Sequence, residues 1–166
     1  MRYNRAVKKQ KQREAGMIYI GITAAIFLLD FFLKKYVDRK YELRKKHRRC
    51  NGKVEIEKYY NDGATLNLLA KHPKVMTAIH TVMMVLVGAV YYIAMRTSGK
   101  RLGKTGLALL AGGGLSNLYD RYTKHHVVDY IRFQIGPAWF RRIIFNVSDF
   151  FIFIGALLAV ADSDCN

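Results

Sequence analysis

Hydrophobic residues along this chain form four long blocks, separated by polar segments that are mostly basic. The blocks lie at about 17–37, 75–95, 105–120 and 143–161. Block 75–95 contains no Asp, Glu, Lys or Arg, so it offers no polar face that a soluble bundle would turn to water. About 20 helical residues cross a hydrocarbon core of about 30 Å. The second and fourth blocks are therefore long enough alone, and the first and third suffice if their polar ends lie at an interface.

This pattern predicts an all-α membrane protein of four transmembrane helices, built as one integral-membrane domain over residues 1–166. The segments at about 38–74 and 121–142 are expected to be extracytoplasmic loops. The loop region between the first two helices is expected to be small, with a short β element as one option. The basic leader before residue 17 is also compatible with a signal peptide, but no small-x-small cleavage site follows it, so we expect the first helix to be retained.

Charge supports a membrane setting and suggests an orientation. Lys and Arg exceed Asp and Glu by 28 to 12, an excess of +16 that favours an anionic membrane surface or nucleic acid as a neighbour. Residues 1–16 carry six Lys or Arg and segment 96–104 carries four, which predicts that both lie in the cytoplasm. With four spans, the N and C termini are then both cytoplasmic. Against this orientation, segment 38–74 holds eleven Lys or Arg, including the run RKKHRR at 44–49.

Several polar residues interrupt the hydrophobic blocks, and ionisable groups inside membrane spans mark candidate functional sites because they are costly to bury. Asp30 and Lys34 are four residues apart with the acid first, which favours a helical ion pair. The simplest interpretation is an interfacial pair that anchors the first helix. Asn117, Asp120 and Arg121 fall at i, i+3 and i+4 and share one helix face. A water-filled cavity or partner groups must satisfy them there.

Asp129 and Asp149 are the candidates for catalysis. If the segment between the third and fourth helices loops outward and returns, both acids lie near the outer leaflet, with Asn146 one turn before Asp149. Two close carboxylates do not both ionise cheaply, which leaves one general acid and one general base, enough to hydrolyse a peptide bond without a cofactor. The residues alone leave simpler roles open. Asp129 pairs with Arg132 or Arg121 in one of them, and Asp149 is an acid favoured by a helix N-terminus in the other.

Five short motifs resemble those of the lipoprotein signal peptidase family, signal peptidase II. In chain order they are LLDFFLKK (28–35), YNDGATLNLL (60–69), NLYDR (117–121), VVDYI (127–131) and FNVSD (145–149). They occur in the family's order and agree with its four-helix plan. The likeness therefore extends over most of the chain and does not rest on one motif.

The resemblance implies an intramembrane aspartic endopeptidase that removes the signal peptide of a prolipoprotein, cutting before the cysteine that carries a diacylglyceryl group. By their place in the motifs, Asp129 and Asp149 match the family's catalytic pair. Polar residues that match positions lining the site and holding the substrate are Asn61, Asn117, Arg121 and Asn146. Residues that match positions with a structural role are Asp30, Lys34, Gly63, Ala64 and Asp120.

The chain also departs from the family pattern. Ser116 and Ser148 stand where the family usually has Gly and Ala, and each adds a hydroxyl near the acids. Thr65 and Leu66 replace a usual Ala-Phe pair in the second motif, so the end of that motif that contacts the substrate is expected to differ. The basic run 44–49 is not a feature that we associate with the family, and we expect it to meet anionic lipid headgroups.

The same resemblance implies ligands and a location. Lipidated prolipoproteins, membrane phospholipid and globomycin-type inhibitors are the expected partners, in the inner (cytoplasmic) membrane of a bacterium. We expect no cofactor, no metal and no nucleic acid, and nothing in the sequence demands more than a monomer.

Two other function classes remain as alternatives. One is a small multi-pass transporter of protons or cations, and the other is a membrane scaffold that binds lipid. A transporter predicts acids spread through the depth of the membrane, whereas Asp120, Asp129 and Asp149 fall near one face. A scaffold leaves Asn117, Arg121, Asn146 and Asp149 without a role.

Overall fold

The computed structural model describes residues 2–63, 71–97 and 99–162, and it contains four α-helices and four β-strands within those ranges. Ala64, Thr65 and Leu66 lie outside the described residues. The elements, in chain order, are α1 (Arg2–Lys40), β1 (Lys46–Arg49), the 3-10 turn η1 (Cys50–Gly52), β2 (Val54–Asn61), α2 (Pro73–Arg96), α3 (Arg101–Lys124), β3 (Val127–Phe133), the 3-10 turn η3 (Phe140–Arg142), β4 (Ile144–Phe145) and α4 (Val147–Ala161).

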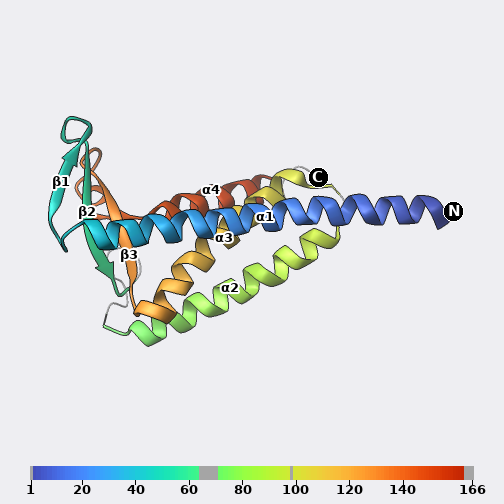
Figure 1. Ribbon diagram of the computed structural model, residues 1–166, viewed down its shortest axis with the longest axis horizontal. Helices are drawn as coiled ribbons and strands as arrows, with labels where there is room; N and C mark the ends of the chain where they lie inside the picture. Colours follow the sequence, from blue (N-terminus) through green and yellow to red (C-terminus); the bar gives the residue numbers. More distant parts are fainter. Residues whose placement is uncertain (1, 64–70, 98, 163–166) are drawn as a thin grey trace.

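The helices run lengthwise together, and the sheet closes one end of the bundle (Figure 1). The N-terminal part of α1 projects beyond the other helices at the opposite end (Figure 1). Helix α3 packs most extensively on α4, then on α1 and α2. It is therefore the central helix of the bundle, which explains why its polar and small residues are buried.

Within the part of the chain that the structure describes, two helices are long and apolar enough to cross a membrane, namely Gly16–Lys40 within α1 and the whole of α2. None of the residues of α2 is buried, and apolar side chains such as Val82, Val85 and Leu86 are more than half exposed. So large an apolar surface is stable in lipid and not in water. The other two predicted spans, in α3 and α4, do not meet the same criteria of length and composition.

The expected start of the fourth helix, at residue 143, is wrong. Ile144 and Phe145 form strand β4, which pairs with Ile131 and Arg132 of β3. Helix α4 begins only at Val147, because Asn146 caps it, and it has 15 residues. At 1.5 Å per residue it is about 22 Å long. The third helix differs in the other direction, because it continues past residue 120 to Lys124 and so includes Arg121.

The β structure is larger than the short element expected between the first two helices. An antiparallel sheet of order β1-β2-β3-β4 joins strands from both of the segments that were expected to be extracytoplasmic loops. Strand β1 lies at the sheet edge and takes in most of the basic run 44–49. Strand β2 lies next to β1 and pairs with β3. After a register shift between Ile56 and Tyr59, Tyr59 lies opposite Asp129 and Asn61 lies opposite Val127. The sheet thus brings the second and fourth motifs of the sequence side by side.

A buried charge cluster joins α1 to α3. Lys34 Nζ lies 2.7 Å from Asp30 Oδ2 and 3.3 Å from Asp120 Oδ2. The second lysine, Lys124, lies 2.9 Å from the other oxygen of Asp120. The ion pair of Asp30 and Lys34 is confirmed, and its two side chains are buried inside the protein, at 0% and 1% exposed. The ion pair can be buried because α3 brings polar partners to it and satisfies both charges inside the protein.

Glycines allow α3 and α4 to lie in backbone contact. A Cβ atom added to Gly155 would come within 2.5 Å of the Gly106 carbonyl oxygen and 2.6 Å of the Leu110 nitrogen. Such distances leave no room for a methyl group beside rigid backbone. Close approach of this kind holds helices together in membranes, where burial of apolar surface gives no net attraction between helices.

The substitution Gly155→Ala is expected to destabilise the fold, by about 1–3 kcal/mol, because it forces α4 away from α3. Gly88→Ala is the matched control. Gly88 lies in α2 with nothing within 4 Å of an added Cβ, and there alanine is neutral or slightly stabilising. Thermal unfolding of the purified proteins in one detergent measures both. Equal midpoints for the two variants would contradict the close packing of α3 on α4.

Candidate active site

The N-terminus of α4 is held by a reciprocal capping box. The Asn146 side chain accepts a hydrogen bond from the Asp149 backbone N–H at 3.1 Å, and the Asp149 Oδ2 accepts one from the Asn146 backbone N–H at 2.9 Å. This pairing satisfies two backbone donors that the first helical turn leaves open. It also fixes the direction in which Asp149 points, because its carboxylate is tied back to the residue before the helix. The helix start thus places a carboxylate at the end of the bundle that the sheet covers.

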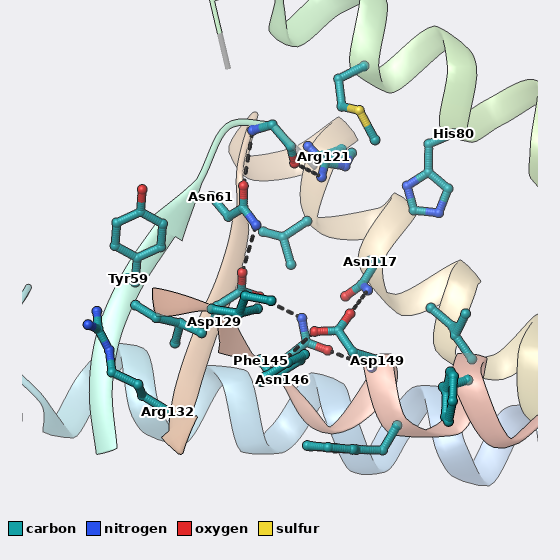
Figure 2. Close-up of a pocket in the computed structure, with 18 of the residues that line it drawn as sticks. Tyr59, Asn61, His80, Asn117, Arg121, Asp129, Arg132, Phe145, Asn146 and Asp149 are labelled. Carbon is teal, nitrogen blue, oxygen red and sulfur yellow. Dashed lines mark hydrogen bonds between the residues drawn. The ribbon is translucent and has the colours of Figure 1, made fainter. Parts of the chain in front are cut away.

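Asp149 receives a further hydrogen bond from α3. The Asn117 Nδ2 donates to Asp149 Oδ1 at 3.0 Å (Figure 2). Both carboxylate oxygens of Asp149 therefore have a donor. The simpler role considered for Asp149, an acid at a helix start, describes its position in the first turn of α4 but does not account for this contact with a second helix.

Asp129 lies on β3 and faces the same space. It is 2% exposed, and its two oxygens accept hydrogen bonds from Asn61 Nδ2 at 2.8 Å and Asn146 Nδ2 at 2.7 Å. Burial raises the pKa of the Asp129 carboxyl well above its usual range, and the neighbouring Asp149 raises it further, while the two amide donors oppose the change. The other simple pairing considered is not the one found, because Arg132 forms its ion pair with Glu57 at 2.8 Å.

Asn146 connects the two acids directly. One side chain donates through Nδ2 to Asp129 and accepts through Oδ1 from the backbone of Asp149 (Figure 2). It is fully buried. Both carboxylates therefore lie within hydrogen-bond reach of a single residue, Asp129 of its side-chain amide and Asp149 of its backbone N–H. This arrangement brings together Asp129 on β3 and Asp149 on α4, which are twenty residues apart in the sequence.

Arg121 and Asn61 close the other side of the site. An Arg121 Nη2 donates to the carbonyl of Gly63, and the Asn61 side-chain oxygen accepts from the Gly63 backbone N–H at 3.1 Å. Among the described residues, Nε and Nη1 of Arg121 have no hydrogen-bond partner although both are buried. A buried guanidinium with unpaired N–H groups beside two acids is suited to hold carbonyl oxygens of a bound peptide.

The acids open into a cavity of about 950 Å³. Its polar lining includes the residues just described together with Tyr59, His80 and Arg142, and most of the remaining wall is apolar. The apolar side chains come from η3, β4 and α4 and include Phe140, Ile143, Phe145, Phe150 and Phe153. A cavity of this size with a few convergent polar groups is typical of a binding site for a long, mostly apolar ligand.

Nearly all of the site residues predicted from the sequence meet here. The structure brings together Asn61, Gly63, Asn117, Arg121, Asp129, Asn146 and Asp149. Asp30, Lys34 and Asp120 lie behind them in the buried charge cluster. Ala64 lies outside the described residues. Among the residues that the structure describes, no three His, Cys, Asp or Glu side chains lie close enough together to hold a metal ion.

Among the lining residues that were not assigned to the site from the sequence are two with polar groups on β2 and α2, Tyr59 and His80. His80 extends from α2 toward the space above Asn117, and Tyr59 lies on β2 (Figure 2). His80 was hidden in a block notable for lacking Asp, Glu, Lys and Arg, but an imidazole in such a block is a signal in itself. Of the two departures from the family pattern, the Ser116 hydroxyl donates to Asp30 at 2.6 Å. The buried Ser148 hydroxyl has no partner among the described residues.

Comparisons with known proteins identify the family of the chain and its fold. The family profile described as signal peptidase (SPase) II matches residues 22–164. The chain is similar to the lipoprotein signal peptidase of Mesorhizobium japonicum, with 40% identity over 104 residues, which are 62% of this chain and 60% of that protein. It is similar to the lipoprotein signal peptidase of Neisseria meningitidis serogroup C, with 34% identity over 146 residues, 87% of this chain and 88% of that protein.

A solved structure described as a bacterial membrane enzyme, at 1.9 Å resolution, has the same fold. It superposes with a TM-score of 0.74 at 20% identity, covering 90% of this chain and 94% of that chain. The protein is thus a membrane peptidase. It belongs to the signal peptidase II family, and removal of signal peptides is its activity. Family membership decides against the transporter and the scaffold.

Asn146 allows its two roles to be separated by substitution. In Asn146→Ser the hydroxyl still caps α4, but the bridge to Asp129 is lost. We expect turnover to fall about tenfold or more, the value of a hydrogen bond to a charged or buried carboxyl. Asn146→Ala is expected to lose the same turnover and, in addition, about 1 kcal/mol of stability with the cap. Signal-peptide cleavage and thermal unfolding measure the two effects. Wild-type turnover in Asn146→Ser would show that the bridge is dispensable.

Proposed function

We propose that this peptidase is an intramembrane aspartic endopeptidase in which Asp129 and Asp149 are the catalytic residues. The observation that carries the proposal is that both carboxylates accept hydrogen bonds from the one buried residue Asn146, Asp129 from its side-chain amide and Asp149 from its backbone N–H, at the wall of a large cavity. In such a pair one carboxyl holds a proton while the other is charged, since two buried charges at close range repel.

The shared proton supplies both halves of peptide hydrolysis. The ionised carboxylate takes a proton from a water molecule as the water oxygen attacks the scissile carbonyl carbon. The protonated carboxyl stabilises the oxygen of the tetrahedral intermediate. When the carbon–nitrogen bond breaks, the leaving amine takes a proton from the acid that received it, and the carboxyl and amine products depart. The reaction consumes the peptide bond and one water molecule, and the two acids return to their starting protonation state.

The polar residues around the acids hold the substrate backbone. The unpaired N–H groups of Arg121 fit peptide carbonyl oxygens, and the amides of Asn61, Asn117 and Asn146 hold the carboxylates in place. A peptide in an extended form, running along β2 and β3, would present its carbonyl groups to these donors. Its position would leave the scissile bond between the two acids.

The substrates are lipoprotein precursors, the class that the names of the similar proteins give. We infer that cleavage occurs before a cysteine that carries a diacylglyceryl group. The apolar wall of the cavity, with its aromatic and aliphatic residues from η3 to α4, suits acyl chains. Globomycin-type peptides are expected to inhibit by occupying the same cavity. Membrane phospholipid is the remaining partner, and the chain acts as a monomer.

We further propose that all four helices cross the inner membrane of a bacterium, with both termini in the cytoplasm and the sheet outside. The cationic segments 1–16 and 96–104 support this orientation. Helix α3 crosses in spite of its polar residues, because the other helices shield and satisfy them. The two acids then lie near the outer boundary of the hydrocarbon, where water and an apolar signal peptide both reach them.

Each of the substitutions Asp129→Asn and Asp149→Asn is expected to lower cleavage by about 100- to 10,000-fold, because an amide neither takes nor gives the shared proton. Glu42→Gln is the matched control, since it makes the same chemical change at an exposed side chain paired with Lys45. Turnover of a lipidated precursor by the purified proteins measures the effect, and thermal unfolding verifies that each variant is folded. Retained turnover in either aspartate variant would refute the aspartic mechanism.

Lipidation of the precursor is expected to precede cleavage. A bare precursor should be cut at least about 100-fold less efficiently, because it lacks acyl chains, whose burial contributes about 0.8 kcal/mol per CH₂. The comparison uses one precursor sequence with and without the diacylglyceryl group, at equal detergent concentration. A gel shift follows the cleavage, and globomycin identifies the part that is due to this site. Equal rates for the two precursors would remove the role assigned to the lipid.

A further inference from the structure

Lys34 is a buried cation that the catalytic step leaves unused. Its side chain is 1% exposed, lies on α1 and is not among the residues that line the cavity. Burial of an ammonium group is costly, so its contacts have to compensate for the lost hydration. Those contacts point from the charge cluster toward the catalytic pair.

The ammonium group of Lys34 has four oxygen neighbours. The shortest contact, 2.6 Å, is to Oδ1 of Asn117, and the next, 2.7 Å, is to Asp30. Asp120 lies at 3.3 Å and the Ser116 hydroxyl at 3.4 Å. An ion pair between Asp30 and Lys34 alone would anchor α1. The contact with Asn117 has a different effect, because Asn117 also touches Asp149.

Lys34 fixes the orientation of the Asn117 amide. An ammonium group has three donors and no acceptor, so only the oxygen of the amide can face it. The NH₂ group must then face the other way, and there it donates to Asp149 Oδ1 at 3.0 Å. If the amide rotated by 180°, its NH₂ would face the ammonium and its oxygen would face a carboxylate. Both contacts of the rotated amide would be repulsive.

Through that amide the positive charge of α1 acts on one acid more than on the other. Asp149 is reached from Lys34 through a single side chain. Asp129 is bound by the neutral amides of Asn61 and Asn146. We propose that Lys34 is a positioning residue: it holds the Asn117 amide toward Asp149 and keeps Asp149 the charged member of the pair, with the proton on Asp129. This inference rests on the proposed aspartic function of the site.

Other ionisable groups face Asp149 and also affect the balance between its charged and its protonated form. They are Asp30 on α1, His80 on α2, Arg121 on α3, and Asp129 and Tyr130 on β3. Arg121 also favours a charged Asp149, and the charges of Arg121 and Lys34 both reach Asp129 as well. Lys34 differs in that its hydrogen bonds continue through Asn117 to Asp149. Lys34 is thus the cation whose hydrogen bonds lead to one acid of the pair.

A test has to separate positioning from anchoring. Lys34→Met removes the donor and the charge but leaves Asp30 buried without its cation, so that variant is expected to be less stable. Asp30→Asn/Lys34→Met restores electrical balance. If Lys34 positions Asn117, the double variant regains thermal stability while kcat on a lipidated precursor stays about tenfold or more below wild type, with KM little changed. If Lys34 only anchors α1, stability and kcat recover together, and the proposal is overturned.

The pH profile supplies a second readout. Asp149 has to be ionised to act as base, so activity falls as the pH drops and Asp149 takes up a proton. Without the charge of Lys34 the ionised form is less favoured, and the acid limb of kcat/KM moves to higher pH by about one unit. Lys34→Gln keeps a donor for Asn117 without the charge. It should retain most of the kcat at the optimum and still move the acid limb, and an unmoved limb in this variant overturns the proposal even where the Met variants do not fold.

Lys104→Met is the matched control. Lys104 is also a buried lysine, 8% exposed, but its ammonium donates to the Thr97 carbonyl at the end of α2, remote from the acids. It should lose stability with an unmoved pH profile. Asp129→Asn in the same assay distinguishes the two levels of inference. If that variant is inactive while the Lys34 variants keep the wild-type profile, the aspartic mechanism stands and only the role of Lys34 is wrong.

Discussion

The hydrogen bonds of Asn146 are the constraint on which the rest of the site depends. One residue ends strand β4, caps helix α4 and bridges Asp129 to Asp149. Asn146 therefore fixes the start of helix α4 relative to a sheet whose strands come from two separate segments of the chain. The cost of leaving a buried carboxylate without donors enforces that registration more strictly than apolar packing would. The contacts that fix the geometry of the two acids are therefore also the contacts that fix the local fold.

Around this point the bundle is organised by charge as much as by apolar contact. The surface of α2 is apolar and exposed, whereas α3 buries Asn117, Asp120 and Arg121. Lipid surrounds the first kind of helix without cost, but it forces the second kind to find partners within the protein. Lys34 and Lys124 supply them for Asp120, and the glycines of α3 let the neighbouring helices come close enough. Polar residues thus determine which helix is central.

The sequence allowed some parts of this structure to be predicted and concealed others for identifiable reasons. Helix α2 agreed with its predicted limits to within two residues, because Pro73 and the polar residues after Arg96 bound an uninterrupted apolar run. The start of α4 was missed because a buried strand and a buried helix are both continuous apolar runs. A short β element between the first two helices was expected as an option, but the four-stranded sheet was not, because β1 is basic and the strands of the sheet come from two distant segments. The acids were found because their motifs resemble a family, and a spacing of twenty residues alone does not show that two side chains meet.

The short length of α4 has a consequence for the membrane around the protein. In the proposed four-span arrangement, a helix of about 22 Å stands beside hydrocarbon that is about 30 Å thick elsewhere. Hydrophobic mismatch of this kind is relieved when the bilayer thins locally, so the headgroup region dips toward the first turn of α4. The hydrolytic water then has a shorter path to Asp149 than the nominal depth of the bilayer suggests. The short helix α4 would in this way give water access to the active site without a channel through the protein.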